Sequence, residues 1–360
     1  MAIESDAPIV LAGVRHGMTT GAPVAMTIEN RDWVNWQHTM HPDADPPAEA
    51  SGAHRAQVTR PRPGHADLAG ALKYGHDDLR NVLERASARE TAARVAAGAI
   101  ARQLLQQVSI HIASHVFAIG PVELPNPGTE PFERLLTIPD DSPTRCLDDD
   151  AAGRMIAAID AARTAGDTLG GAFEVVAHGV PPGLGSYGQW DRRLDGRLAQ
   201  ALMSIPAIKA VGIGLGTEAA RRPGSLAHDA ILVRQDGTAS HESMPVHRAS
   251  NHAGGLEGGV TNGQDVRVSA FMKPIATLMT PLPSVDLTSL AAAEAAIERS
   301  DVCAVPAASV VGEAMVALVL ADALLERFGG DTVDDLRRQY GTWQRTVVER
   351  FATRHGGATP

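Results

Sequence analysis

Residues 251–277 read Asn-His-Ala-Gly-Gly-Leu-Glu-Gly-Gly-Val-Thr-Asn-Gly-Gln-Asp-Val-Arg-Val-Ser-Ala-Phe-Met-Lys-Pro-Ile-Ala-Thr. Five glycines occupy the ten positions from Gly254 to Gly263. Glycine costs backbone entropy, so such a run indicates positive φ angles or close approach of the backbone to a ligand. A strand-like run over 266–271 follows and leads to Lys273, one of three lysines in the chain. The stretch is typical of a binding loop followed by a fixed cation, not of a linker.

The composition limits the class of protein. With 360 residues, 44% of them hydrophobic, the chain is long enough for one large domain or two smaller ones. Charged residues at 21% argue against a disordered chain. The net charge of −10 argues against a nucleic-acid-binding protein, because phosphate backbones favour a basic face. Anionic ligands remain possible through local clusters of arginine.

The sequence carries no sign of a targeting segment or of a metal site. No run approaches the roughly 20 apolar residues that span a membrane. The start, Met-Ala-Ile-Glu-Ser-Asp, lacks the basic and apolar regions of a signal peptide. Cys146 and Cys303 are too few for a disulfide framework or a cysteine zinc site, and no zinc-ligand spacing occurs elsewhere. We therefore expect a soluble, cytoplasmic protein without a metal, a nucleic-acid partner or a membrane partner.

The hydrophobic patterns predict a mixture of helices and strands. Asp150 is a candidate N-cap for a helix over 151–165 that ends at Gly166, and Thr288 or Ser289 is a candidate cap for a short helix ending at Arg299. The other predicted helices cover 87–107, 191–204, 307–328 and 332–352, the last polar on one face. Strands are predicted within 8–28 and at 108–119, 171–178, 207–213, 229–234 and 266–271, and loops at 37–61 and 181–188.

One sequence pattern occurs twice. Glu84-Arg85 precedes a long alanine-rich helix, and Glu298-Arg299 precedes another of similar length. One interpretation is an internal duplication with an arginine at the start of each helix. The other is two ordinary core helices.

Three short segments combine groups that are suited to anion binding or proton transfer. In Arg85-Ala-Ser-Ala-Arg89 a helix start and two arginines favour a phosphate, although Ser87 could equally be an N-cap between solvated arginines. In Arg62-Pro-Gly-His65-Ala-Asp67 the histidine could be a general acid, although most of the 14 histidines must be ordinary. In Arg299-Ser-Asp301 the carboxylate forms a structural ion pair or is a base held ionised.

The glycine-rich loop does not match the common nucleotide-binding motifs. No Gly-Lys-Ser/Thr follows at P-loop spacing, and a strand follows the loop where a dinucleotide fingerprint requires a helix. A Gly-x-Ser-x-Gly elbow is also absent from the sequence.

Taken together, these segments closely resemble the chorismate synthase family. The resemblance runs from near residue 3 to about residue 330 in family order, and several blocks are long and unusual. The blocks are Gly13-Val-Arg-His-Gly17, Thr20-Gly-Ala-Pro23, Glu29-Asn30, Arg62-Pro-Gly-His-Ala-Asp67, Ser87 to Ile100, Ala201-Leu-Met-Ser204, Asn251-His-Ala-Gly-Gly255, Lys273-Pro274 and Arg299-Ser-Asp301.

The resemblance implies a fold and an activity. The fold is α+β, a sandwich with helices packed between two antiparallel sheets, and the assembly is a homotetramer. The activity is a 1,4-anti elimination of phosphate from 5-enolpyruvylshikimate 3-phosphate to give chorismate, the last step of the shikimate pathway in aromatic amino acid biosynthesis. Reduced FMN is required without net oxidation or reduction. Some members also carry an NADP-linked flavin reductase activity. Because no additional domain is visible here, we expect an external flavin reductase.

The resemblance also implies roles for individual residues. His65 corresponds to a histidine proposed to act as an acid, and Asp301 to a carboxylate proposed as a base working through the flavin N5. Ser87 belongs with these catalytic positions. The substrate-binding positions are Arg62, Arg89 and Arg299. The flavin-binding positions are Arg85, Ala86, Ser87, Pro206, Ala207, Gly258, Lys273, Pro274, Ile275, Ala276, Thr277 and Arg299.

The chain departs from the family pattern in places. Ala86 stands where serine is frequent, and Pro206 where an amide is frequent, so backbone contacts would survive there and side-chain hydrogen bonds would not. The family's initial Gly-Glu-Ser-His-Gly block, with a second catalytic histidine, and the basic loop after it do not occur in this sequence. We therefore expect the 360-residue form to be unstable, inactive or both, and the alternative function is a catalytically inactive flavin- or phosphate-binding relative.

We expect a single domain over 1–330 and a C-terminal surface helix and tail over 331–360.

Overall fold

The computed structural model describes residues 6–43, 56–125, 128–233 and 246–355, with side chains up to residue 350. Within it the chain forms two compact units. The first unit comprises 1–96 and 276–300, and the second comprises 97–275 and 301–360. The chain therefore leaves the second unit after Ile275 and returns to it at Asp301.

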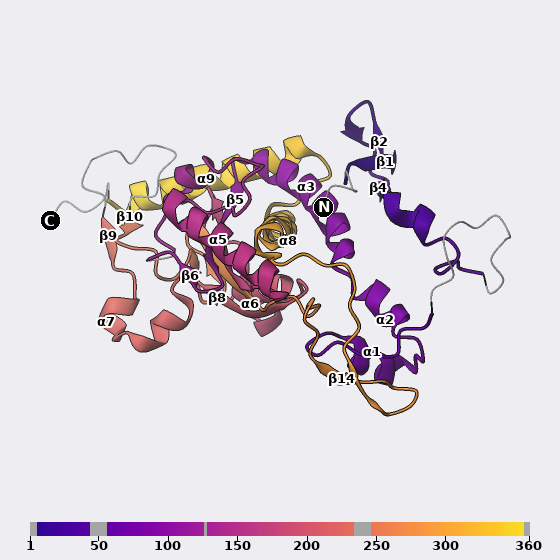
Figure 1. The fold of residues 1–360 in the computed structure, drawn as a ribbon. Helices are drawn as coiled ribbons and strands as arrows, with labels where there is room; N and C mark the ends of the chain where they lie inside the picture. The colour runs from indigo at the N-terminus through magenta and orange to yellow at the C-terminus, as the bar shows by residue number, and fades with distance from the viewer. Residues whose placement is uncertain (1–5, 44–55, 126–127, 234–245, 356–360) are drawn as a thin grey trace. The chain divides into compact units, whose positions relative to one another are not determined.

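The first unit contains short strands and helices (Figure 1). Strand β1 (Pro8–Ala12) pairs with β4 (Ala25–Ile28), β2 (Val14–Arg15) with β3 (Met18–Thr19), and β14 (Pro283–Val285) with β15 (Ala292–Glu294), all antiparallel. The helices are η1 (Arg31–Asn35), α1 (Asp67–Tyr74), α2 (Arg80–Arg85), η2 (Ala88–Glu90) and the first turns of α3 (Thr91–Gln106). Its small core contains Ala71, Leu79 and Val82, packed against Val58 and Leu287.

The second unit is built on a five-stranded antiparallel sheet. The strand order is β6 (Val122–Glu123), β5 (His111–Ile119), β7 (Gly171–His178), β13 (Val266–Met272) and β8 (Ile208–Ile213). The other elements are α4 (Phe132–Leu135), α5 (Asp149–Ala165), η3 (Trp190–Arg192), α6 (Leu194–Met203), η4 (Gly216–Arg221), α7 (Gly224–Ala227), β9 (Ile231–Val233), β10 (Val246–Arg248), β11 (Leu256–Glu257), β12 (Val260–Thr261), α8 (Val305–Phe328) and α9 (Val333–His355).

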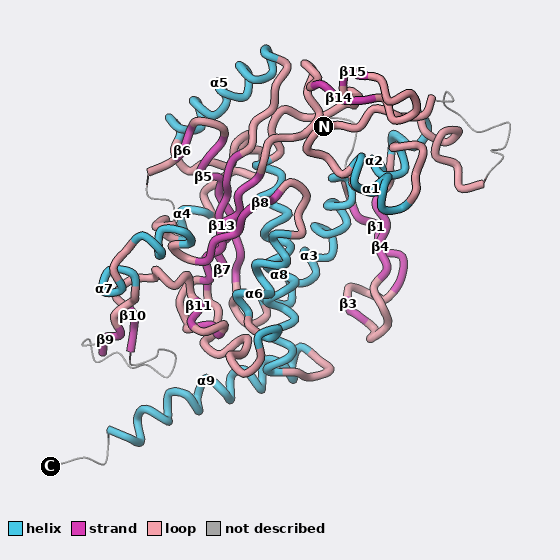
Figure 2. Tube along the Cα trace, turned by 90° about the horizontal axis from the view of Figure 1, so that it is seen from below, coloured by secondary structure: helices cyan, strands magenta, loops and turns pink. Residues whose placement is uncertain are grey.

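Helices cover both faces of this sheet. Because strand side chains alternate between faces, Val175 and its neighbours two residues away point to the side on which α8 packs. Figure 2 shows α6 and α8 on one side of the sheet, with α4 and α5 on the other. Phe132 and Leu135 of α4 form a cluster with Ala113 and Val176. The strands β5, β7 and β13 are accordingly buried on both faces for most of their length. Their few polar side chains, such as Ser114, Glu174 and Arg267, are buried as well.

Helix α8 is the central helix of the second unit. Pro306 lies in its first turn, where a missing N–H costs nothing, and the helix ends at Gly329, whose N–H donates to the Leu325 carbonyl. Contrary to the expectation from sequence, α8 is by length and composition long and apolar enough to cross a membrane. However, 67% of its most apolar stretch is buried inside the structure, as in the core helix of a soluble protein.

The predicted α+β class is confirmed. The strand over 171–178 and the long helix ending before Gly329 form as expected. The N-cap of α5 is Asp148, whose carboxylate accepts from the Ala151 N–H at 2.7 Å, so Asp150 as the cap was wrong. The aspartate at 148 has the extended backbone of a cap, whereas the one at 150 lies inside the first turn.

The predicted helix from Thr288 or Ser289 to Arg299 was also wrong. The Asp286 carboxylate accepts from the N–H groups of both Thr288 and Ser289 at 3.0 Å, which closes a turn instead of starting a helix. That turn connects β14 to β15, and the following residues up to Ser300 have no helical structure. Part of the predicted 37–61 loop (residues 44–55) and residue 234 of the predicted 229–234 strand lie outside the described residues.

Close packing between α3 and α8 generates a stability prediction. A Cβ added at Gly98 would lie 2.4 Å from the Ala314 Cβ, whereas one added at Gly153 on α5 would have nothing within 4 Å. We expect Gly98→Ala to lower the free energy of unfolding by about 1–3 kcal/mol through overpacking. The control Gly153→Ala should raise it by about 0.5–1 kcal/mol, because alanine is the better helix former. Urea denaturation of both variants measures the difference, and equal effects would contradict the close packing.

Candidate functional site

The segment Arg62–Asp67 forms a buried polar cluster at the start of α1. The Arg62 Nε and backbone N–H both donate to the Asp67 Oδ2 at 3.0 Å, and the Arg62 Nη1 donates to the Thr277 hydroxyl at 2.6 Å. The His65 Nδ1 lies 2.5 Å from the Asp67 Oδ1. Asp67 is 1% exposed and Arg62 is 8% exposed, so both charges are shielded from water. All four residues belong to the first unit.

The Asp67 carboxylate determines the state of its neighbours. Burial raises the pKa of Asp67, but hydrogen bonds from His65 and Arg62 and the Arg62 charge outweigh burial and bring the pKa well below its ordinary value. Because an ionised carboxylate only accepts hydrogen bonds, the short contact assigns an N–H to the His65 Nδ1, which donates a hydrogen bond to Asp67. The Nε2 of the half-buried imidazole then lies 3.4 Å from the Arg62 Nη2 and is the ring nitrogen that can exchange a proton with a ligand.

The segment from Arg85 to Arg89 connects α2 to α3. Ser87 has extended backbone, and its hydroxyl accepts from the Arg89 N–H at 3.2 Å. The capping interpretation of Ser87 is therefore correct for its side chain. Arg89 forms an ion pair with Asp6 and donates to the Glu29 carbonyl at 3.2 Å. Arg85 is exposed and Ala86 half-buried, so this segment presents a cation and backbone groups at its surface.

In the second unit, the chain after β13 lies against the 206–207 segment. The Lys273 N–H donates to the Ala207 carbonyl at 2.9 Å, and Ala207 has a φ of 69°, in the left-handed region. Burial of Lys273 and the positive charge of Lys209 both lower the pKa of Lys273. Two cations that repel each other make this place favourable for an anionic or electron-rich ligand.

The glycine-rich loop is held in shape by two side chains. The Asp229 carboxylate accepts from the N–H groups of His252 and Ala253 at 2.8 and 2.9 Å, and these hydrogen bonds, with one from Ser250, outweigh burial and lower its pKa. The Asn251 amide bridges the Gly255 N–H and the Asp265 carbonyl. Gly258 has a φ of 61° with open space where a Cβ would lie, so its backbone is accessible.

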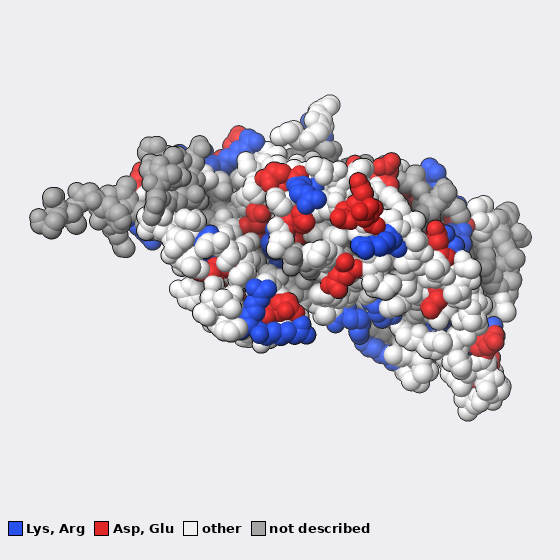
Figure 3. Space-filling model, turned by 60° about the vertical axis from the view of Figure 1, so that its left-hand side comes forward, with Lys and Arg blue, Asp and Glu red and all other residues white. Residues whose placement is uncertain are grey.

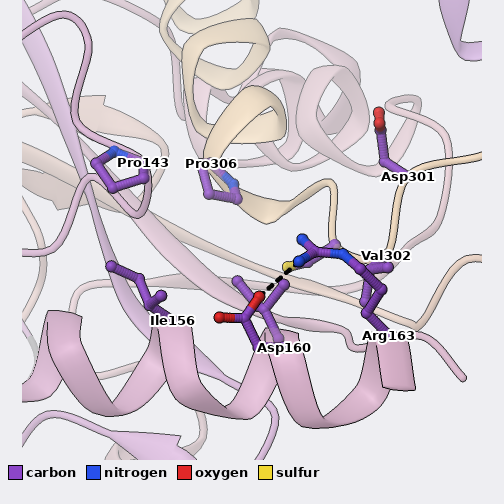
Figure 4. A pocket seen from close by; sticks show the side chains of 9 residues that line it. Pro143, Ile156, Asp160, Arg163, Asp301, Val302 and Pro306 are labelled. Atoms are coloured by element: carbon purple, nitrogen blue, oxygen red, sulfur yellow. Dashed lines mark hydrogen bonds and ion pairs between the residues drawn. The ribbon is translucent and has the colours of Figure 1, made fainter. Parts of the chain in front are cut away.

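Asp301 lies at the edge of a cavity of about 270 Å³. Figure 4 shows Asp160 and Arg163 of α5 paired beside Val302, while the Asp301 side chain points away from that pair. The Cys303 thiol also lines the cavity, and burial raises the pKa of this thiol. Asp301 is therefore an accessible carboxylate, and Arg299 in the first unit is an exposed arginine.

The predicted site residues are divided between the two units. The first unit holds Arg62, His65, Arg85, Ala86, Ser87, Arg89, Ala276, Thr277 and Arg299, and the second holds Pro206, Ala207, Gly258, Lys273, Pro274, Ile275 and Asp301. Within each unit the structure brings together Arg62, His65 and Thr277, and Ala207 with Lys273. The role of Asp229 was not predicted from the sequence, where it is a single aspartate 22 residues before Asn251 without a surrounding motif.

Surface charge is mixed. Figure 3 shows basic side chains in small groups next to acidic ones on one face of the molecule. In an acidic protein, such local groups of arginine and lysine are the places where an anion can bind. Among the described residues, no three His, Cys, Asp or Glu side chains are arranged to hold a metal ion.

The residues of the second unit fit a reduced flavin. Such a ring is electron-rich and flat, and it carries polar edge atoms that bind to backbone N–H and C=O groups. The accessible Gly258 backbone and the Lys273–Lys209 pair provide groups of that chemistry. In the first unit, taken by itself, the exposed Arg85 and the Ser87 hydroxyl are groups that suit a phosphate.

Comparisons with known proteins agree on one family. The chorismate synthase family model matches residues 1–325. The chain is 56% identical to the chorismate synthase of Moorella thermoacetica over 97% of this chain and 87% of that protein. It is 52% identical to that of Kocuria rhizophila over 98% of this chain and 83% of that protein. A solved structure titled "Crystal Structure of Chorismate Synthase" aligns with a TM-score of 0.74 and 42% identity, covering 95% of this chain and 85% of that one.

The Asp67 cluster predicts a pH-dependent stability. We expect Asp67→Asn to lower the free energy of unfolding by about 3 kcal/mol at pH 7, because it leaves the Arg62 charge buried without its partner. The folded pKa of Asp67 lies below the unfolded value of about 3.9. The stability difference between Asp67→Asn and the unchanged chain should therefore have its full size above that pH, and it should shrink as the pH falls below it. Urea denaturation from pH 7 to pH 3 measures this, and the control Asp160→Asn, in an exposed ion pair, should cost no more than about 0.5 kcal/mol.

The Lys273–Lys209 pair predicts a charge coupling. Lys209→Gln removes the nearby positive charge, so we expect the pKa of Lys273 to rise towards its ordinary value. ¹³C reductive methylation followed by an NMR pH titration measures it, since only the three lysines and the N-terminal amine contribute signals and Lys273→Arg identifies the resonance. Lys209→Arg keeps the charge and should leave the pKa of Lys273 where it is. Equal titration curves for the Lys209→Gln and Lys209→Arg proteins would contradict the coupling.

Proposed function

Because the chain belongs to the chorismate synthase family of lyases, we propose that it converts 5-enolpyruvylshikimate 3-phosphate to chorismate. The C3–O bond breaks and phosphate leaves with its electron pair, a proton leaves C6, and a second ring double bond forms. The observation that carries the proposal is the buried Arg62–Asp67–His65 cluster, which lies within the residues matched by the family model.

The substrate carries a phosphate and two carboxylates, so it requires several cations. In the proposal Arg62, Arg89 and Arg299 bind these anions. Arg62 is pre-oriented by Asp67 and Thr277, which reduces the side-chain entropy lost on binding. Arg89 is paired with Asp6 and the Glu29 carbonyl, so substrate binding by Arg89 includes an exchange of these partners.

His65 is the acid in this proposal. Asp67 fixes the tautomer and the ring orientation through Nδ1, so Nε2 is the position that donates a proton towards a departing or developing anion. Asp301, an exposed carboxylate, is the base, and Ser87 holds the 87–89 backbone with its hydroxyl.

Reduced FMN is the proposed cofactor, and when bound it supplies electron density to the allylic system and recovers it afterwards. The backbone of Pro206, Ala207, Gly258 and the segment 273–277 would hold the ring, with Arg85, Ala86, Ser87 and Arg299 on the remaining polar groups. Lys273, beside Lys209, favours negative charge on a ligand placed there. We propose that an external reductase supplies the reduced form, and that the protein is a cytoplasmic homotetramer.

The test is anaerobic turnover of 5-enolpyruvylshikimate 3-phosphate with dithionite-reduced FMN. We expect His65→Asn to lower turnover about 10²–10⁴-fold, the usual contribution of general acid catalysis. The control His111→Asn, at an exposed position on β5, should leave turnover unchanged. The chain should be assayed beside a form extended by the family's Gly-Glu-Ser-His-Gly block and basic loop. Absence of chorismate from both folded, FMN-binding forms would favour the inactive flavin-binding relative.

A further inference from the structure

The turn of residues 166–171, Gly-Asp-Thr-Leu-Gly-Gly, leads from α5 into β7 and contains none of the candidate site residues. Gly166 ends α5 in the left-handed conformation with a φ of 70°, and the Asp167 N–H donates to the Ala162 carbonyl at 2.9 Å. These bonds fix the direction in which the turn leaves the helix. The next residue, Thr168, is 6% exposed although its side chain is polar.

Thr168 contacts the segment that follows β13. Its hydroxyl donates to the Ile275 carbonyl at 2.7 Å. Residues 273–275 lie beyond the end of β13 and have no ladder partner, and Pro274 has no N–H to donate. The segment is instead held at its two ends, by the Lys273 N–H on the Ala207 carbonyl and by Thr168 on the Ile275 carbonyl. Removal of the Thr168 hydroxyl would leave only the first of these two anchors.

The same turn contacts the segment that begins at Asp301. The Leu169 N–H donates to the Val302 carbonyl at 2.9 Å, and Leu169 pairs with Cys303 as in a parallel sheet. Asp301 is the residue directly before this pair. Two consecutive residues of one turn thus hold the two stretches of chain to which Lys273 and Asp301 belong.

The glycines of the turn allow this close contact. A Cβ added at Gly170 would lie 2.3 Å from the Met272 carbonyl oxygen, which only glycine permits without movement of the backbone. The Gly170 carbonyl also accepts from the Gly120 N–H at 2.9 Å. The turn is therefore packed between the β5–β6 connection and the end of β13, and its position is determined by backbone contacts on both sides.

We propose that Thr168 is a positioning residue for the flavin-binding segment, acting through the Ile275 carbonyl on the backbone of 273–275. The inference rests on the proposed function, since it assumes that this segment binds the flavin. If the segment shifts when this hydrogen bond is lost, the ligand must restore the binding geometry, which lowers the affinity by at most the free energy of that bond. A purely structural hydroxyl would change the melting temperature and leave the affinity for flavin unchanged.

The experiment compares Thr168→Val, which keeps the shape and removes the hydroxyl, with Thr168→Ser, which keeps the hydroxyl. FMN affinity is measured by quenching of flavin fluorescence and by the flavin absorbance difference spectrum, well below each melting temperature. We expect Thr168→Val to raise the Kd for FMN about three- to tenfold and to alter the spectrum. Thr168→Ser should stay within about twofold of the unchanged chain, as serine offers the same donor.

The matched control is Thr144→Val, at a threonine that is 1% exposed and that contacts Cys146 instead of the 273–275 segment. It should lower the melting temperature without changing the Kd. Thr168→Val with the affinity and spectrum of the unchanged chain overturns the inference, and so does failure of both Thr168→Val and Thr168→Ala to fold while Thr144→Val folds. Failure of the unchanged chain to bind FMN refutes the flavin part of the proposed function itself, which separates the two cases.

Discussion

The burial of α8 against the five-stranded sheet is the constraint on which the second unit depends. Glycines allow the close approach, since a Cβ at Gly312 would lie 2.6 Å from the Phe173 ring and one at Gly98 would meet Ala314. The helix also carries Glu313 into this interface, where it is 5% exposed. Arg102, Arg145 and the Ser114 hydroxyl bind its carboxylate at 2.7–2.9 Å. A buried charge is tolerated only with such partners. Glu313 therefore fixes both the rotation of α8 about its axis and its position along the sheet.

That placement determines where the functional segments begin. Asp301 lies four residues before α8, and the 166–171 turn lies directly before β7, on which α8 packs. The sheet positions the end of β13, and thereby Lys273, through the register of β13 with β7 and β8. The reactive groups are thus on irregular segments, and rigid elements fix the ends of these segments.

In each unit a buried carboxylate binds an arginine and a histidine. In the first unit Asp67 satisfies Arg62 and orients His65, so one buried carboxylate sets the geometry of a cation and of a proton donor. In the second unit Glu174 binds Arg267 at 2.7 Å and His115 at 3.2 Å on the sheet face opposite α8. There the hydrogen bonds and the arginine charge outweigh burial and lower the pKa of Glu174. The first cluster leaves the imidazole Nε2 for a ligand, whereas the second encloses all its charges in the core.

The sequence by itself determined the α+β class, the strands at 171–178 and 266–271, the long apolar helix and the family. The reason is that hydrophobic periodicity, glycines that end helices and long motif blocks are all local signals. It also indicated Arg62, His65 and Asp67 as a group, since they are adjacent in the chain. Only the tertiary structure decided that Thr277 holds Arg62, that Asp229 shapes the glycine loop and that Thr168 supports Ile275. Those partners are 215, 24 and 107 residues apart. No local pattern encodes such pairs. The Asp286 turn differs from them, because its carboxylate accepts from N–H groups only two and three residues along the chain and so replaces the expected helix cap by a local alternative.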